Sequence, residues 1–118
     1  MNNTHQYQLI MVQPQGRLDV QGGRALEKQL VSLVTDSQTL LIVNLEQVEF
    51  MNSSGLVSLA RALKNARISG CRLVLCNLQP PIKLIFELTQ LDSVFEIFDT
   101  CAAAKATVEK VEKAVLVA

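Results

Sequence analysis

The sequence predicts an α/β fold in which a mixed, mostly parallel β-sheet of four to five strands is covered by about four helices. The first observation is a pair of nearly continuous apolar runs, at residues 40–43 and 71–76, which are typical of parallel strands buried on both faces. The second is a helical stripe formed by Leu56, Leu59, Ala60 and Leu63. The third is that strand and helix patterns alternate along the chain, as they do in sheets covered by helices.

The first third of the chain is predicted to form two strands and a helix. Residues 1–6 are polar, and we expect them to be flexible. Residues 7–13 mix apolar and β-branched side chains and end at Pro14, which suits a first strand at an edge of the sheet. A turn then leads into a short strand at Arg17 and Leu18. Asp19 stands before a helical pattern carried by Leu26, Leu30, Leu33 and Val34.

The junction before the central helix is the most closely specified part of the chain. Asn52 is a favoured N-cap residue, and Met51 and Leu56 occupy the two positions of a hydrophobic staple. Ser53 and Ser54 therefore fall in the first helical turn, where free N–H groups and the helix dipole favour a phosphate by about 0.3–1 kcal/mol. We expect Phe50, Met51 and Leu56 to anchor this turn in the core, so that the serines lie on a rigid surface.

The C-terminal half is predicted to contain two further strands and two further helices. Ser69 and Gly70 end the central helix, and residues 71–76 form the second buried strand. Pro80 opens a helix whose inner face is expected to be Leu84, Ile85, Leu88 and Leu91. Residues 94–98 form a short last strand. Asp99 and Thr100 then offer caps to a terminal helix with an inner stripe of Ala104, Val108, Val111 and Val115.

Length and composition indicate one domain, over residues 7–118, in a chain of 118 residues. The chain is 49% hydrophobic, yet no apolar run approaches the roughly 20 residues that would cross a bilayer. The first residues lack a secretory segment, so we expect a cytoplasmic protein without direct membrane insertion. Lysine and arginine number 11, as do aspartate and glutamate, and this balance argues against nucleic-acid binding.

No catalytic, cofactor-binding or metal-binding residue is predicted. The single histidine, His5, lies in the expected flexible terminus, and no Gly-x-Ser-x-Gly elbow, phosphate-binding glycine loop or helical histidine pair occurs. Cys71, Cys76 and Cys101 have no metal-ligand spacing, and we expect them to be buried free thiols. An enzyme is therefore not expected, although an enzyme of unknown reaction stays open as a third hypothesis.

Residues 41–56, which read LIVNLEQVEFMNSSGL, resemble the signature of STAS domains and most closely that of bacterial anti-sigma-factor antagonists. Two further segments are similar to the family pattern: Gly16-Arg17-Leu18-Asp19, and the Leu-x-x-Val-Phe-x-Ile segment at residues 91–97. The resemblance implies a STAS-like domain in which the second serine of the motif, Ser54, is the phosphoacceptor. Asn52 departs from the aspartate of many switching members.

The resemblance also implies how such a protein acts. It would bind an anti-sigma factor that is also an ATP-dependent serine kinase, regulate transcription indirectly, and be reset by a serine phosphatase. The predicted partner-binding residues surround the motif: Asp19, Asn52, Ser53, Ser54, Gly55, Ser58 and Arg61. Asp19 could equally be a plain N-cap, and Arg61, Lys64 and Arg67 a solvated helix face. The alternative hypothesis is a STAS scaffold or accessory subunit of a signalling complex or membrane transport system, without phosphorylation.

Overall fold

The computed structural model describes residues 6–34, 38–108 and 110–117. Its central sheet consists of five parallel strands in the order β6–β5–β3–β1–β7, and β2 pairs with β4 in a separate, two-stranded parallel sheet. The elements are β1 (Gln6–Val12), β2 (Gly16–Leu18), α1 (Val20–Leu33), β3 (Thr39–Asn44), β4 (Val48–Met51), α2 (Ser53–Ile68), β5 (Arg72–Cys76), α3 (Pro80–Leu88), η1 (Leu91–Ser93), β6 (Glu96–Phe98), α4 (Cys101–Lys105) and β7 (Lys110–Val117). The predicted α/β fold with a mostly parallel sheet is confirmed.

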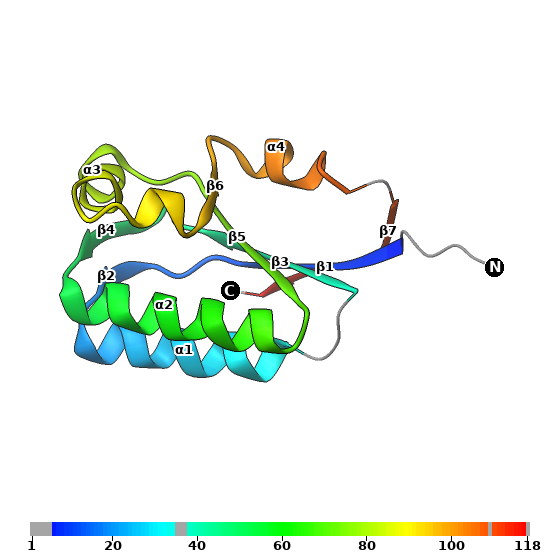
Figure 1. Cartoon of the computed structure of the whole chain (residues 1–118), viewed down its shortest axis with the longest axis horizontal. Coiled ribbons are helices and arrows are strands. Elements are labelled where there is room, and N and C mark those ends of the chain that lie inside the picture. Colours follow the sequence, from blue (N-terminus) through cyan, green and yellow to red (C-terminus); the bar gives the residue numbers. More distant parts are fainter. Residues whose placement is uncertain (1–5, 35–37, 109, 118) are drawn as a thin grey trace.

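Helices cover both faces of the central sheet, but unequally. The long helices α1 and α2 lie side by side on one face, and the short helix α4 lies on the other (Figure 1). Alternate residues of β3, the middle strand of the sheet, point to these two layers. Leu41 and Val43 pack in the α1–α2 core, whereas Leu40 and Ile42 pack toward Ala104 of α4. All four strand residues are fully buried, which is why their sequence shows no polar alternation.

The C-terminal prediction is wrong. Helix α4 ends at Lys105, and the chain continues as strand β7, which pairs in parallel with β1 from Gln6 to Val12. The valines at residues 111 and 115 fit a helical stripe, but valine is also a strong strand former. Strand β1 needs partners for its backbone groups on the side away from β3, and β7 supplies them. For the same reason β1 is an interior strand and not the edge strand that was expected.

Two core assignments also need correction. In α3 the buried side chains are Ile82 and Phe86, whereas Leu84 and Leu88 are 51% and 75% exposed. Both sets obey helical spacing, so periodicity alone could not choose between them. Phe50 lies in β4 and is only partly buried, with the Arg17 guanidinium 3.9 Å from its ring centroid. Met51 and Leu56 are buried as expected.

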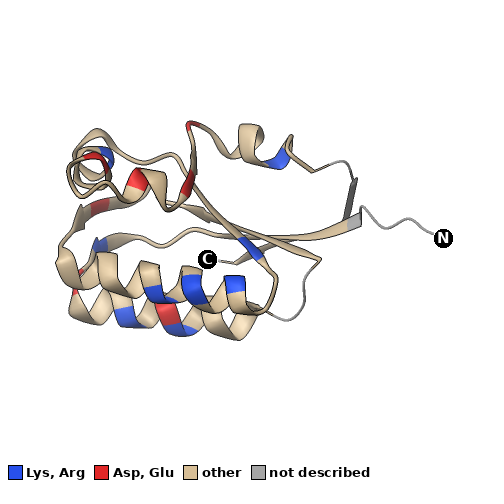
Figure 2. Ribbon diagram, in the orientation of Figure 1, with Lys and Arg blue, Asp and Glu red and all other residues tan. Residues whose placement is uncertain are grey.

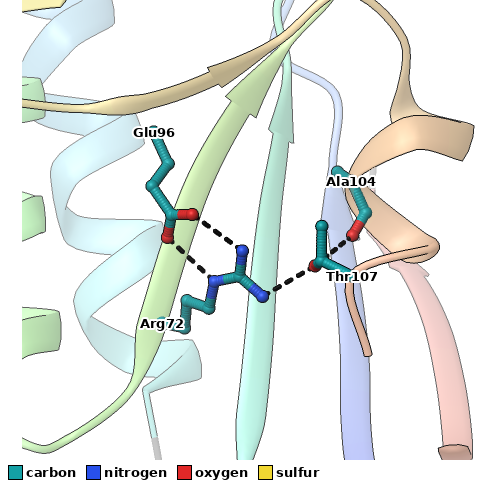
Figure 3. A network of polar contacts seen from close by, with 4 residues as sticks. All are labelled: Arg72, Glu96, Ala104 and Thr107. Atoms are coloured by element: carbon teal, nitrogen blue, oxygen red, sulfur yellow. Dashed lines mark hydrogen bonds and ion pairs between the residues drawn. The ribbon is translucent and has the colours of Figure 1, made fainter. Parts of the chain in front are cut away.

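An arginine network fastens the edge strand β6 to its neighbours. Arg72 of β5 makes a two-pronged contact with Glu96 of β6, its Nε donating to Oε1 at 2.8 Å and its Nη2 to Oε2 at 2.7 Å. Its third nitrogen, Nη1, donates to Thr107 Oγ1 at 2.7 Å, and that hydroxyl donates to the Ala104 carbonyl, also at 2.7 Å (Figure 3). One side chain therefore connects β5, β6 and the segment that follows α4.

The cysteines differ from expectation. Cys76, at the end of β5, and Cys101, at the start of α4, form a disulfide across 25 residues of chain. They meet because β6 pairs with β5 and returns the chain to the same end of the sheet, with Phe98 opposite Cys76. Cys71 alone is the buried free thiol that was predicted, on the opposite face of the sheet from Cys76.

Within residues 6–34, 38–108 and 110–117, no helix is both long and apolar enough to cross a bilayer. The predicted flexible terminus falls almost wholly on residues 1–5, outside the described residues, and Gln6 already belongs to β1.

Candidate partner-binding site

The two long helices begin at the same end of the molecule, each with a side-chain cap (Figure 1). Asp19 Oδ1 accepts a hydrogen bond from Gly22 N at 3.0 Å at the start of α1. Asn52 Oδ1 accepts one from Gly55 N at 3.1 Å at the start of α2. Each cap satisfies a backbone N–H that has no partner inside its own helix, and so fixes where the helix begins.

Glycines allow the starts of these helices to approach closely. Gly55 is buried, and a Cβ there would collide with the carbonyl oxygen of Leu18 in β2. A Cβ at Gly23 of α1 would lie 2.9 Å from Ser58 Oγ and 3.1 Å from Gly55 Cα. A side chain at either position would push α2 outward, so both glycines set the position of the serines relative to α1.

Between the two helix starts lies an open groove of about 250 Å³. Its lining combines hydroxyl, guanidinium and apolar groups: Val20, Arg24, Ser53, Ser54, Val57, Ser58 and Arg61. Ser53 is exposed, Ser54 is partly exposed, and Ser58 is only 4% exposed. We call this feature the serine groove.

The structure brings together most of the residues that the sequence pointed to. Ser53, Ser54, Ser58 and Arg61 line the serine groove. The remaining three support it from outside the lining: Asn52 caps α2, Gly55 packs on β2, and Asp19 caps α1. Whether these residues bind a partner stays a prediction.

Three residues of the groove were not predicted: Val20, Arg24 and Val57. Arg24 lies outside the apolar stripe of α1, as a solvated residue would. Arg24 lies beside the serines only because α1 packs alongside α2, and the sequence does not show this packing. Val20 and Val57 are each 48% exposed, and nothing in the sequence alone distinguished them from other valines of the chain.

The charges around the groove are mostly positive. Helix α1 contributes Arg24 and Lys28, α2 contributes Arg61, Lys64 and Arg67, and Glu27 is the one carboxylate on these two helices. Figure 2 shows this gathering of basic residues over the α1–α2 layer. The chain as a whole is neutral, so the layer is positive at the expense of other parts of the surface.

At the rim, the pKa of Asp19 is held below its ordinary value. The hydrogen bond from the Gly22 backbone is the main cause, and the charge of Arg17 adds to it, with an ion-pair distance of 3.7 Å. Asp19 therefore keeps its carboxylate form, and its cap, well below neutral pH.

The lining of the serine groove, within the described residues, offers few groups for acid–base chemistry. Its lining contains no histidine, carboxylate or lysine that could take a proton from Ser54. Among the described residues, no group of three or more His, Cys, Asp or Glu side chains could hold a metal ion. The groove presents the hydroxyls of Ser53 and Ser54, with the buried hydroxyl of Ser58 beside them.

Comparison with known proteins identifies the family. The STAS domain model matches residues 1–104, which is most of the chain. The chain belongs to the STAS family. Among its relatives is BtrV of Bordetella bronchiseptica, named as a candidate anti-sigma factor antagonist, which is 27% identical over 92 residues, covering 78% of this chain and 79% of BtrV.

Solved structures of other proteins have the same fold. An anti-sigma factor antagonist from Mycobacterium paratuberculosis superposes with a TM-score of 0.69 at 29% identity, covering 80% of each chain. A sulfate transporter family protein from Wolinella succinogenes superposes with a TM-score of 0.72 at 14% identity, covering 84% of this chain and 83% of that one. The same fold therefore occurs in a protein named as an anti-sigma factor antagonist and in one named as a sulfate transporter family protein. At 14% identity, the similarity to the latter is one of fold alone.

Proposed function

We propose that this STAS protein is an anti-sigma factor antagonist that is switched by phosphorylation at Ser54. It docks through the serine groove onto an anti-sigma factor that is also a serine kinase, and docking releases the sigma factor. The kinase then transfers the γ-phosphoryl group of ATP to Ser54 Oγ, the hydroxyl proton leaves to the kinase, and ADP is released. A serine phosphatase hydrolyses the phosphoester and restores the antagonist, which is a substrate here and not an enzyme.

The observation that carries this proposal is the placement of Ser54. It lies in the first turn of a 16-residue helix whose start is fixed by the Asn52 cap and by the contact of Gly55 with β2. Its side chain is partly exposed in the serine groove, which has no base of its own. A serine that is held rigidly, open to a partner and unable to act alone suits a substrate of a kinase.

The balance of free energies favours a switch that leaves the fold intact. A phosphate in the first turn of a helix is stabilised by about 0.3–1 kcal/mol, and by roughly 2 kcal/mol at most. Burying its outward oxygens under a partner that offers no matching cation costs several kcal/mol. Since about 1.4 kcal/mol corresponds to a tenfold change in affinity, phosphorylation is expected to weaken docking roughly a hundredfold or more.

The first test is mass spectrometry of the protein isolated from its own host, with and without phosphatase treatment. A single phosphatase-sensitive phosphate on Ser54 supports the switch. An unmodified Ser54 across growth and stress conditions contradicts it.

The second test is calorimetry of binding to the cognate anti-sigma factor, once it has been identified in the host. Ser54→Asp should weaken binding at least about tenfold with little change in melting temperature, whereas Ser54→Ala should bind but accept no phosphate. Ser69→Asp, at the far end of α2, is the matched control and should bind as wild type does. Equal binding by Ser54→Asp and wild type would refute the electrostatic switch.

A second function is favoured by one residue. Asn52 retains the cap but lacks the carboxylate that the family motif often carries before the serines. A STAS protein that never needs to engage a kinase, such as a scaffold or an accessory subunit of a signalling complex or membrane transport system, would tolerate this change. Transporter genes beside this one, together with an unmodified Ser54, would support that role.

A further inference from the structure

A buried hydroxyl lacks a partner in the serine groove. Ser58 is 4% exposed and lines the groove, yet its Oγ makes no hydrogen bond to any residue within 6–34, 38–108 and 110–117. Nearly all buried polar side chains in folded proteins are hydrogen-bonded to protein, to ordered water or to a ligand, so a hydroxyl without a protein partner can donate to a group that enters the groove. Its Oγ–H is therefore available as a donor.

Two guanidinium groups line the same groove, and no carboxylate does. Within the described part of the chain, Arg24 makes no ion pair or hydrogen bond. Arg61 reaches only Glu27, at 4.0 Å, with its own side chain 64% exposed. Guanidinium groups bind phosphate oxygens through paired N–H donors, so the lining of the groove has the donors that an oxyanion requires. The nearby carboxylates, Asp19 at the rim and Glu27 beside Arg61, lie outside this lining.

Ser54 is placed to deliver that oxyanion. Ser54 and Ser58 are four residues apart on α2 and therefore lie on the same face of the helix, one turn apart. Both line the groove, so a group attached to Ser54 Oγ enters the space that Ser58, Arg24 and Arg61 surround.

We propose that the serine groove is an oxyanion site that receives the phosphate of phosphorylated Ser54, bound by Arg24 and Arg61 and by a hydrogen bond from Ser58 Oγ. The inference deepens the proposed function and rests on it for the identity of the anion. Because the groove is open, the phosphate keeps its outer oxygens toward a docking partner. The groove thus stabilises the phosphorylated form and holds the charge where it opposes docking.

The test uses the full chain with phosphoserine placed at residue 54 during translation, so that no kinase is needed. Phosphorus NMR then gives the second pKa of the phosphate, which is about 6 in an unstructured chain. The guanidinium groups of Arg24 and Arg61 favour the phosphate dianion over the monoanion. In the folded protein this pKa should therefore lie roughly half a unit or more below its value in the same protein in urea. In the Arg24→Gln, Arg61→Gln double variant it should return most of the way to the unfolded value.

The matched control is the Lys28→Gln, Lys64→Gln double variant. It removes the same charge from the same two helices about one turn farther from the serines, and should move the phosphate pKa much less. Ser58→Ala should give a smaller rise than the arginine variant. Circular dichroism confirms that each variant is folded.

Two results would overturn the inference. The first is a phosphate pKa that is the same in the folded and the unfolded chain. The second is an equal pKa shift in the arginine and lysine variants, which would mean that the overall positive charge of the two helices acts on the phosphate and not a specific site. The outcome is separable from that of the proposed function. If Ser54 is never phosphorylated in the host, the proposed function fails, while the phosphorus NMR result still reports on the groove.

Discussion

Asn52 shows how much a single residue of this protein can decide. Its Oδ1 accepts from Gly55 N, so it starts α2 at Ser53 and places Ser54 in the first turn. The same atom exists in aspartate, so asparagine preserves the geometry of the site and removes only a negative charge. The cap is therefore structural whether or not the serine is a substrate.

The contribution of the Asn52 cap to stability can be measured from the free energy of unfolding of Asn52 variants. Asn52→Ala should lower the free energy of unfolding by about 1 kcal/mol, because Gly55 N loses its acceptor. Asn52→Asp keeps the acceptor and adds a negative charge that interacts favourably with the helix dipole. Its free energy of unfolding should therefore be equal to that of wild type or higher by about 0.3–1 kcal/mol. Urea unfolding followed by circular dichroism measures both. An Asn52→Ala protein as stable as wild type would show that the hydrogen bond contributes nothing.

At the scale of elements, β6 is a three-residue edge strand that depends on side-chain contacts as well as on its ladder. Arg72 holds it through Glu96, and the hydrogen bond from Arg72 is the main reason that the pKa of Glu96 lies below its ordinary value. The same contact raises the pKa of Arg72. This places part of the attachment of β6 under the control of pH.

The sign of that control follows from the lowered pKa of Glu96. The pair stabilises the fold above the ordinary glutamate pKa of about 4.3, and the contribution is lost as the pH falls through the lower folded-state value. Glu96 is 47% exposed, so we expect less than about 1 kcal/mol at neutral pH. Urea midpoints of wild type and Glu96→Gln should therefore differ at pH 7 and converge near pH 3. Glu87→Gln, exposed on α3, is the control, and a gap that widens in acid would contradict the assignment.

At the scale of the whole molecule, the half of the chain beyond α2 is tied back onto the sheet at several points. Strand β7 returns to pair with β1, and the Cys76–Cys101 disulfide joins the end of β5 to α4. The disulfide restricts the unfolded chain over 25 residues, which in the chain-entropy account corresponds to roughly 3 kcal/mol.

The contribution of the disulfide can be isolated with redox conditions. Without reductant, Cys101→Ser should melt several degrees below wild type, because its unfolded chain is less restricted. With excess dithiothreitol the two proteins should melt much closer together. Cys71→Ser is a control for loss of a thiol outside the bridge, and its stability should not depend on reductant. Equal melting of Cys101→Ser and wild type without reductant would show that the bridge adds no stability.

The sequence by itself determined the features that depend on neighbouring residues. The buried strand at residues 40–43, the Asn52 cap and the end of α2 at Ser69 and Gly70 were all predicted, because propensity, burial pattern and capping act over a few residues. The serine motif was likewise readable, and four of the seven predicted site residues line one groove.

Only the tertiary structure decided what joins distant segments. The last residues form β7 because β1 offers unpaired backbone groups, and α3 buries Phe86 in place of Leu88 because of the surface it meets. Cys101 reaches Cys76 through the return of β6, and Arg24 joins the serines through the packing of α1 on α2. In each case the local sequence does not decide the outcome, and contacts with segments far along the chain do.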